Sequence, residues 1–471
     1  MKKTMSDSFE SARTLHHAGE FASAAALYQE VVEHDPEHFK ALNNLGACRD
    51  ELGQLDQAEI AFRTALALMP GEAPIAHNLG RILHKKGIHA EAELHYRRSI
   101  ELDSSVADTH FNLGRLLQDQ TKLEQAATAL QSATELNPDN EAAQSVLGDV
   151  LFDLRMLEPA LSTYRRVTEI TPHNAYAHFQ VGKALETLQR SDEAAESFRR
   201  AVEIDTGSAA AREALARTLS TAGRHNEAIN SLNAWLEKHP GNPLAIHMLA
   251  ALGAGDTPDR ASDGYVRETF DRFAEDFDRT LEKLQYQAPQ LVHQVIRESF
   301  GEPAGNLQVL DAGCGTGLCG PLLRPFAQSL IGIDLSAGML KLADAHKVYD
   351  ELLEVELASY LATQHARFDL IASADTFCYL GKLDQALKAA AQALKAGGVL
   401  ILTLEQHSGS APYQLQAHGR YAHAETYVRA MLEEAGFGNV EIGYDKLRLE
   451  AGVPVPGLIV SAWVGADSAG V

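Results

Sequence analysis

A small apolar position recurs every 34 residues through the first half of this 471-residue chain. Alanine occupies it in seven successive units, at Ala24, Ala58, Ala92, Ala126, Ala160, Ala194 and Ala228. A bulky apolar side chain follows four residues later each time, at Tyr28, Phe62, Tyr96, Leu130, Tyr164, Phe198 and Leu232. In most units a proline stands twelve residues after the alanine, where it ends a helix because it cannot continue the hydrogen-bond ladder. The period therefore predicts a stack of helix pairs.

A glycine stands upstream in five of the units, at Gly46, Gly80, Gly114, Gly148 and Gly182. A small residue on one helix and a bulky one on its partner let an antiparallel pair approach closely. Taken together, these positions resemble seven tetratricopeptide repeats over about residues 5–240. Residues 243–252 predict a cap helix of the kind that the end of a solenoid needs.

Three of the repeats carry Asn-Leu-Gly, which places Asn44, Asn78 and Asn112 one repeat apart. An asparagine amide can both donate to and accept from an extended peptide backbone. The spacing is similar to the asparagine ladder of the tetratricopeptide superhelix in O-linked N-acetylglucosamine transferases. That resemblance implies a protein or peptide bound in the groove. The alternative is that the three asparagines are solvated or helix-packing polar residues.

From Asn306 onward, strand-like segments alternate with helical ones, which predicts a parallel, doubly wound sheet. The first strand ends in the glycine-rich turn at residues 311–317, where glycines allow the backbone to approach a ligand. Its G-x-G-x-G spacing differs from that of dinucleotide sites. An acidic residue, Asp311, stands two residues before Gly313. A pyrophosphate would gain nothing from this carboxylate, whereas a cationic sulfonium and its ammonium group would be attracted to it.

The next three strands are followed by acidic residues, which the sheet should bring to the same edge. Asp334 ends the second strand, where a carboxylate can accept both hydroxyls of a ribose. Met339, in the helix that follows, can lie against a purine face. Glu356 comes near the end of the third strand and would face the edge of an adenine. Asp375 comes at the end of the fourth strand, above the reacting centre.

The motifs D-x-G-x-G-T-G, I-D-L-S-x-x-M-L and F-D-L-I resemble those of the class I S-adenosylmethionine-dependent methyltransferases, over about residues 305–465. The resemblance implies S-adenosylmethionine as cofactor and a Rossmann-like seven-stranded α/β domain that ends in an antiparallel hairpin. It places the methionine part of the cofactor at Gly313, Gly315 and Gly317, and the ribose at Asp334. The whole chain looks like bacterial fusions of tetratricopeptide repeats to a methyltransferase, which share the run at residues 277–289.

Between the repeats and the sheet, Tyr265, Phe270, Phe273 and Phe277 recur at helical spacing. This aromatic stripe is either a helix packing face or a lid over a bound cofactor.

The segment from residue 408 to 423 reads as a loop at the active edge of the sheet, and it contains the candidate catalytic residues Tyr413, Arg420 and His423. A histidine there could deprotonate a nucleophile at neutral pH. The alternative is that these are ordinary polar residues of a loop.

Composition narrows the possible partners. The net charge of −23 is shared almost equally by the two halves, and no cluster of Lys and Arg is present, which argues against nucleic acid. The four cysteines are scattered and predict neither a disulfide framework nor a metal site. No apolar run has the length of a membrane span or of a signal peptide, so we expect a cytoplasmic protein.

The sequence thus predicts an all-α tetratricopeptide superhelical solenoid over residues 1–254, a linker and helical lid over 255–304, and an α/β methyltransferase domain over 305–471. The function that this organisation favours is methyl transfer to a protein or peptide that the repeats recruit. The alternative is a small-molecule O- or N-methyltransferase whose repeats serve assembly.

Overall fold

The structure is a computed structural model that describes residues 5–450 and 452–465. The chain divides into two compact units between Ala211 and Arg212, and each unit is described by itself.

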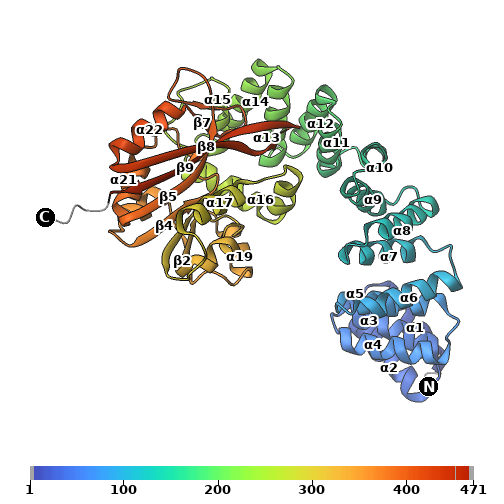
Figure 1. Cartoon of the computed structure of the whole chain (residues 1–471). Helices are drawn as coiled ribbons and strands as arrows, with labels where there is room; N and C mark the ends of the chain where they lie inside the picture. Colours follow the sequence, from blue (N-terminus) through green and yellow to red (C-terminus); the bar gives the residue numbers. More distant parts are fainter. Residues whose placement is uncertain (1–4, 451, 466–471) are drawn as a thin grey trace. The chain divides into compact units, whose positions relative to one another are not determined.

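The first unit is a row of antiparallel helix pairs, coloured blue to green in Figure 1. Its helices are α1 (Met5–His17), α2 (Phe21–His34), α3 (Phe39–Glu51), α4 (Leu55–Leu68), α5 (Ala73–Lys85), α6 (His89–Leu102), α7 (Ala107–Asp119), α8 (Leu123–Leu136), α9 (Glu141–Asp153), α10 (Leu157–Ile170), α11 (Ala175–Thr187) and α12 (Ser191–Ile204). A Cβ at Gly46 would lie 2.8 Å from the Phe62 ring, and one at Gly148 would lie 2.5 Å from the Tyr164 ring. The helix crossing therefore requires glycine, and the predicted repeat is confirmed.

The second unit begins with the last repeat and the predicted cap helix: α13 (Ala209–Thr221), α14 (His225–Lys238) and α15 (Pro243–Ala251). The His247 ring of α15 stacks on Tyr265 with 3.9 Å between ring centroids, and its Nε2 donates to the Gly419 carbonyl at 2.8 Å. Glu213 of α13 pairs with Arg272 at 2.8 Å. These contacts lie within the second unit, so the last repeat and the cap helix belong to the same compact unit as the residues after them. The expected boundary at residue 254, where the repeat pattern ends, stays a prediction.

Two further helices, α16 (Asp263–Lys283) and α17 (Ala288–Phe300), precede a mixed sheet. The strands are β1 (Leu307–Ala312), β2 (Ala327–Asp334), β3 (Glu351–Glu354), β4 (Phe368–Ser373), β5 (Leu394–Gln406), β6 (Tyr413–Leu415), β7 (Tyr421–His423), β8 (Phe437–Glu450) and β9 (Val453–Val464). The central order is β3-β2-β1-β4-β5, all parallel, and β9 pairs antiparallel with both β5 and β8. The predicted Rossmann-like sheet with its antiparallel hairpin is confirmed.

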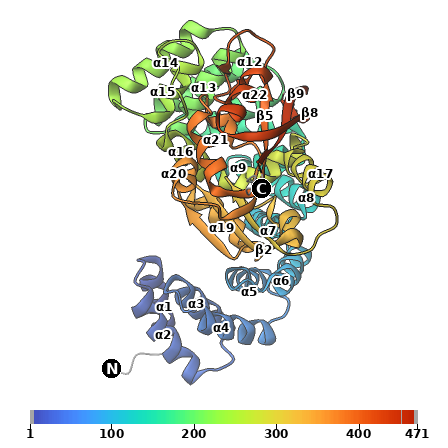
Figure 2. The ribbon, with the colours of Figure 1, turned by 60° about the vertical axis from the view of Figure 1, so that its left-hand side comes forward.

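Helices cover both faces of this sheet, as Figure 2 shows for α20 and α21 on one side and α17 on the other. The connecting elements are α18 (Gly320–Leu323), η1 (Arg324–Phe326), α19 (Ala337–Ala345), α20 (Leu357–Ala362), η2 (Phe377–Tyr379), α21 (Asp384–Ala393) and α22 (Glu425–Glu434). One apolar core lies between the sheet and α20, α21 and α22, and a second lies between the sheet and α17 and α18.

The segment 408–423 differs from the expected loop. It forms the short strands β6 and β7, which pair antiparallel with each other. Strand β7 also pairs in parallel with the carboxyl end of β5. Within the described ranges, no helix is both long enough and apolar enough to cross a membrane.

Candidate functional site

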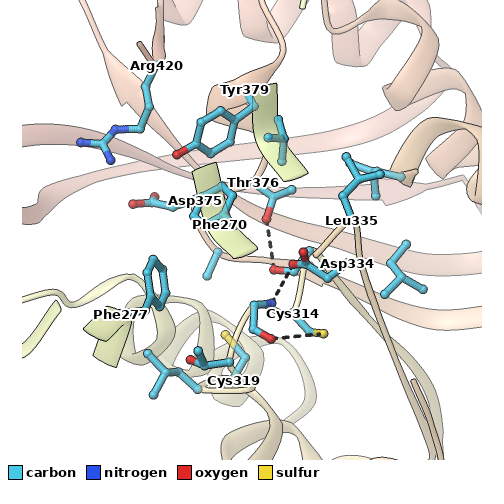
Figure 3. A pocket seen from close by; sticks show the side chains of 18 of the residues that line it. Phe270, Phe277, Cys314, Cys319, Asp334, Leu335, Asp375, Thr376, Tyr379 and Arg420 are labelled. Atoms are coloured by element: carbon cyan, nitrogen blue, oxygen red, sulfur yellow. Dashed lines mark hydrogen bonds between the residues drawn. The ribbon is translucent and has the colours of Figure 1, made fainter. Parts of the chain in front are cut away.

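The second unit contains a cavity at the carboxyl ends of β1, β2 and β4 (Figure 3). Its empty space, open mouth included, is about 1250 Å³. Figure 3 shows its two ends: the turn at Cys314 lies with Asp334 and Leu335, and Arg420, Tyr379 and Asp375 lie opposite.

The glycine-rich turn after β1 forms one end of the cavity. Gly313 has a φ of +77°, and a Cβ there would lie 2.1 Å from the Thr376 hydroxyl oxygen, so close approach of β1 and β4 demands glycine. Gly315 has a φ of +55° with nothing within 4 Å of its Cβ position, and it lines the cavity. At Gly315 the turn therefore presents bare backbone to whatever the cavity binds, beside the lining residues Cys314 and Thr316.

Asp334, the last residue of β2, faces the same turn. Its Oδ2 accepts from the Gly315 N–H and its Oδ1 from the Ser336 N–H, each at 2.9 Å. Burial raises the pKa of Asp334, and these backbone hydrogen bonds oppose the shift. Since each carboxylate oxygen has two lone pairs, Asp334 retains acceptor capacity toward the cavity that it lines.

A hydrogen-bonded ion network forms the opposite end. Arg448, whose side chain is only 2% exposed, donates from Nη1 to Asp375 Oδ2 at 3.0 Å and from Nε to Glu450 Oε1 at 2.9 Å. Its Nη2 pairs with Glu405, which also accepts from Arg420 Nε at 2.7 Å. Arg420, Arg448 and Asp375 all line the cavity. Their charges are therefore largely satisfied within the protein.

Arg448 reaches this position because of a β-bulge in β8. The pairing of β8 with β9 shifts register between Lys446 and Arg448, so that Leu447 and Arg448 are both buried although they are consecutive. A bulge redirects a side chain in this way. The segment that precedes α17 docks on the same bulge, since the Gln287 N–H donates to the Leu447 carbonyl at 2.9 Å.

Two phenols complete this end of the cavity. Tyr286 stands in the docked segment and Tyr379 in η2, and both line the cavity. Burial raises the pKa of each phenol above its ordinary value, so both keep their protons. Within the described residues, neither hydroxyl makes a hydrogen bond to the protein.

Helix α16 forms the roof, and Phe270 and Phe277 of its aromatic stripe line the cavity. Two acidic residues hydrogen-bond α16 to the rest of the domain: Asp278 accepts from the Thr316 hydroxyl at 2.5 Å, and Asp271 accepts from the Gly338 N–H at 3.1 Å. Phe270 and Phe277 thus cover the cavity, whereas Tyr265 packs on His247 and Phe273 is exposed.

Of the predicted cofactor-binding residues, Gly313, Gly315, Asp334, Glu356 and Asp375 line the cavity. Glu356 caps α20 and accepts from the Ala358 and Ser359 N–H groups at 3.1 and 2.7 Å.

Three predicted residues do not line it. The side chain of Asp311 is buried away from the cavity: its Oδ2 accepts from the Tyr349 hydroxyl at 2.6 Å, and burial raises the pKa of Asp311 to about 7. The prediction that it attracts a cofactor cation is corrected accordingly. Gly317 packs against α19, with its Cβ position 3.1 Å from Ala343, and Met339 is fully buried in α19.

The predicted catalytic residues divide in the same way. Arg420 lines the cavity, but His423 and Tyr413 do not. His423 is fully buried, its Nε2 donates to the Leu380 carbonyl at 2.8 Å, and burial lowers its pKa to about 4. Tyr413 packs against Tyr421 and His423. The structure therefore corrects the assignment of His423 as a base and of Tyr413 as a catalytic residue.

The first unit contains the second candidate site. Asn44, Asn78 and Asn112 are half-buried on α3, α5 and α7, which contact one another in succession. The Asn78 amide donates to Asn43 Oδ1 at 3.0 Å, and the Asn44 amide donates to the Tyr28 hydroxyl at 3.2 Å. Two of the three asparagines thus already bond within the repeats.

Comparison with known families agrees with this organisation. A family model described as a methyltransferase domain matches residues 310–402. Models described as tetratricopeptide repeats match residues 15–79, 73–105, 111–175, 158–209 and 187–252.

Curated relatives are methyltransferases. Human methyltransferase-like protein 27 is 30% identical over 31% of this chain and 60% of its own length. The rat mitochondrial ubiquinone biosynthesis O-methyltransferase is 30% identical over 22% of this chain and 32% of its own length. The malonyl-[acyl-carrier protein] O-methyltransferase of Geobacter sulfurreducens is 29% identical over 43% and 81%. The chain thus spans less than two thirds of the first two relatives.

Among solved structures, YrrB, described as a tetratricopeptide-repeat protein with an unusual peptide-binding site, is 24% identical with a TM-score of 0.37. The match covers 39% of this chain and 95% of YrrB.

The fold and the family matches define the class of protein: tetratricopeptide repeats followed by a methyltransferase domain. The curated relatives that resemble its second part are methyltransferases.

Proposed function

We propose that the chain is a class I S-adenosylmethionine-dependent methyltransferase whose tetratricopeptide repeats recruit a protein or peptide. The observation that carries the proposal is Asp334, a half-buried carboxylate that lines the cavity and accepts a hydrogen bond from the Gly315 N–H.

The wall of the cavity fits the cofactor chemically. The carboxylate of Asp334 would accept the ribose hydroxyls, and the backbone at Gly313 and Gly315 would lie along the methionine part. Leu335, Val355 and Leu357 give an apolar surface for a purine, next to Glu356 at its edge. The bound cofactor supplies an electrophilic methyl group on a sulfonium. The protein's part is to align that group with an acceptor and to exclude water, which the aromatic lid supports.

The names of two relatives, both O-methyltransferases, support oxygen as the acceptor atom. The repeats support a macromolecular acceptor, since their half-buried asparagines offer amide groups to an extended backbone. The alternative is a small-molecule acceptor, with the repeats used for assembly. Asn44, Asn78 and Asn112 distinguish the two, because they are remote in sequence from the cavity residues.

The test uses the full chain, labelled S-adenosylmethionine and a cell extract fractionated by size. The triple variant of Asn44, Asn78 and Asn112 to Ala should lower labelling of the macromolecular fraction about tenfold or more, with unchanged affinity for the cofactor. The matched control is Asn137→Ala, which replaces an asparagine in the turn that connects α8 and α9. Label that appears only in small metabolites, with the triple variant fully active, would reject recruitment and favour the alternative.

A further inference from the structure

The one carboxylate at the acceptor end of the cavity, among the residues that the structure describes, is Asp375; burial raises its pKa, and it is ion-paired with Arg448. The residues that line the cavity, all within the described ranges, include no histidine and no lysine. Burial raises the pKa values of the Cys314 and Cys319 thiols, so neither is a thiolate. Asp375 is already held by Arg448 at 3.0 Å and by the Thr403 hydroxyl at 2.7 Å.

The same end instead offers hydrogen-bond donors. The hydroxyls of Tyr286 and Tyr379 make no hydrogen bond within the described residues. Arg420 donates from Nε and Nη2 to Glu405 and Glu450, and its Nη1 donates to no described residue. Tyr286, Tyr379 and Arg420 line the same cavity, and Figure 3 shows Tyr379 on the same side as Arg420 and Asp375. Tyr286 stands in the segment that docks on the bulge next to Arg448.

These hydrogen-bond donors keep their protons, and no unpaired base stands beside them. Such a site suits a methyl acceptor that is already ionised in solution. A carboxylic acid loses its proton near pH 4, whereas a phenol or an ammonium group keeps its proton to about pH 10. Of these three groups, only the carboxylate is therefore already deprotonated at pH 7 without help from the protein.

We propose that the methyl acceptor is a carboxylate, held by the hydroxyls of Tyr286 and Tyr379 and by Arg420, and that the product is a methyl ester. This inference rests on the proposed function and names the substrate class for the same cavity.

The step balances without a base. A carboxylate oxygen forms a bond to the methyl carbon, the carbon–sulfur bond breaks, and its electron pair stays on sulfur, which becomes a neutral thioether. No proton is taken up or released. Because a cation and an anion neutralise each other, the apolar roof of Phe270 and Phe277 favours the transition state over the separated charges.

The experiment follows the chemistry of the product, using the full chain, S-adenosylmethionine labelled in its methyl group and a cell extract. Methyl esters release volatile methanol in mild alkali, whereas methyl ethers and N-methyl groups do not. We expect most of the label that depends on the chain to be released as methanol. Label that is stable to alkali would overturn the inference. Fractionation by size before the alkali step shows whether the carboxylate belongs to a protein or to a small acid.

Variants locate the binding groups. Tyr286→Phe and Tyr379→Phe should each raise the KM for the labelled acceptor fraction about tenfold or more, because each removes a hydrogen bond to a charged oxygen. Affinity for S-adenosylmethionine, measured by calorimetry, should stay unchanged. Tyr444→Phe, at an exposed tyrosine of β8, is the matched control and should behave as the unaltered chain. Unaltered KM values in both cavity variants would overturn the assignment of these phenols.

The two proposals fail separately. If calorimetry shows that the unaltered chain does not bind S-adenosylmethionine, the proposed function fails. If the cofactor binds and the transferred label resists alkali, only the carboxylate inference fails.

Discussion

Replacing Arg448 by methionine should destabilise the second unit strongly. The guanidinium is 2% exposed and pairs with Asp375, Glu405 and Glu450, two of them at about 3 Å. Methionine fills a similar volume but leaves the carboxylate of Asp375 without its ion-pair partner, while Glu405 and Glu450 keep their pairs with Arg420. Breaking a buried pair by removing one member costs about 3–5 kcal/mol, and we expect a loss in that range for Arg448→Met.

The chain offers a probe that reports on this unit alone. Its two tryptophans, Trp235 and Trp463, both lie in the second unit, so tryptophan fluorescence during urea unfolding does not register the first unit. The matched control is Arg429→Met, whose guanidinium is 40% exposed and pairs with Glu425 one helical turn away. That exchange should cost less than about 1 kcal/mol. Equal losses for the two variants would refute the account of the buried network.

The dependence on pH provides a second check. Burial would raise the pKa of Glu405, but the hydrogen bond from His418 and the charges of Arg420 and Arg448 outweigh it and hold that pKa well below its usual range. A depressed pKa stabilises the folded state fully above the unfolded value of about 4.3, and this contribution is lost as the pH falls below it. In Arg448→Met the carboxylates that have lost Arg448 are more readily protonated. The difference in unfolding free energy between the unaltered chain and Arg448→Met should therefore narrow from pH 7 toward pH 4. A difference that stays constant would contradict this reasoning.

Two further predictions concern the repeats and the buried histidine. Gly148→Ala should destabilise the first unit by about 1–3 kcal/mol, measured by circular dichroism, because the new Cβ would lie 2.5 Å from the Tyr164 ring. Gly71→Ala, with open space at its Cβ position, should be nearly neutral. His423, whose pKa is lowered to about 4, should stay neutral from pH 8 to pH 5 in a histidine NMR titration, and its contribution to stability should fall as the pH drops below about 6.5. A His423 resonance that titrates near pH 6.5 would contradict the observed burial.

The repeats could be predicted from the sequence because each helix pair packs through residues a fixed distance apart, such as Gly148 and Tyr164. The strand ends at Gly315 and Asp334 were predictable for a related reason, since parallel strands bring their carboxyl ends to one edge.

Other parts of the site depend on details that sequence patterns do not contain. Asp311 is held by the Tyr349 hydroxyl, a contact between residues 38 positions apart that no motif shows. Arg448 reaches the cavity only because of the bulge at Leu447. Tyr286 was visible within the run at residues 277–289, but its position depends on docking to a strand about 160 residues away.

Calorimetric titration of the full chain with S-adenosylmethionine tests the central claim most directly. The unaltered chain should bind the cofactor, and Asp334→Ala should weaken binding by about 2 kcal/mol or more, roughly thirtyfold, because the ribose hydroxyls lose a charged acceptor. Asp344→Ala, at an exposed carboxylate of α19, should bind as the unaltered chain does, and fluorescence should show that both variants are folded. Failure of the unaltered chain to bind, or equal affinity in Asp334→Ala, would contradict the account.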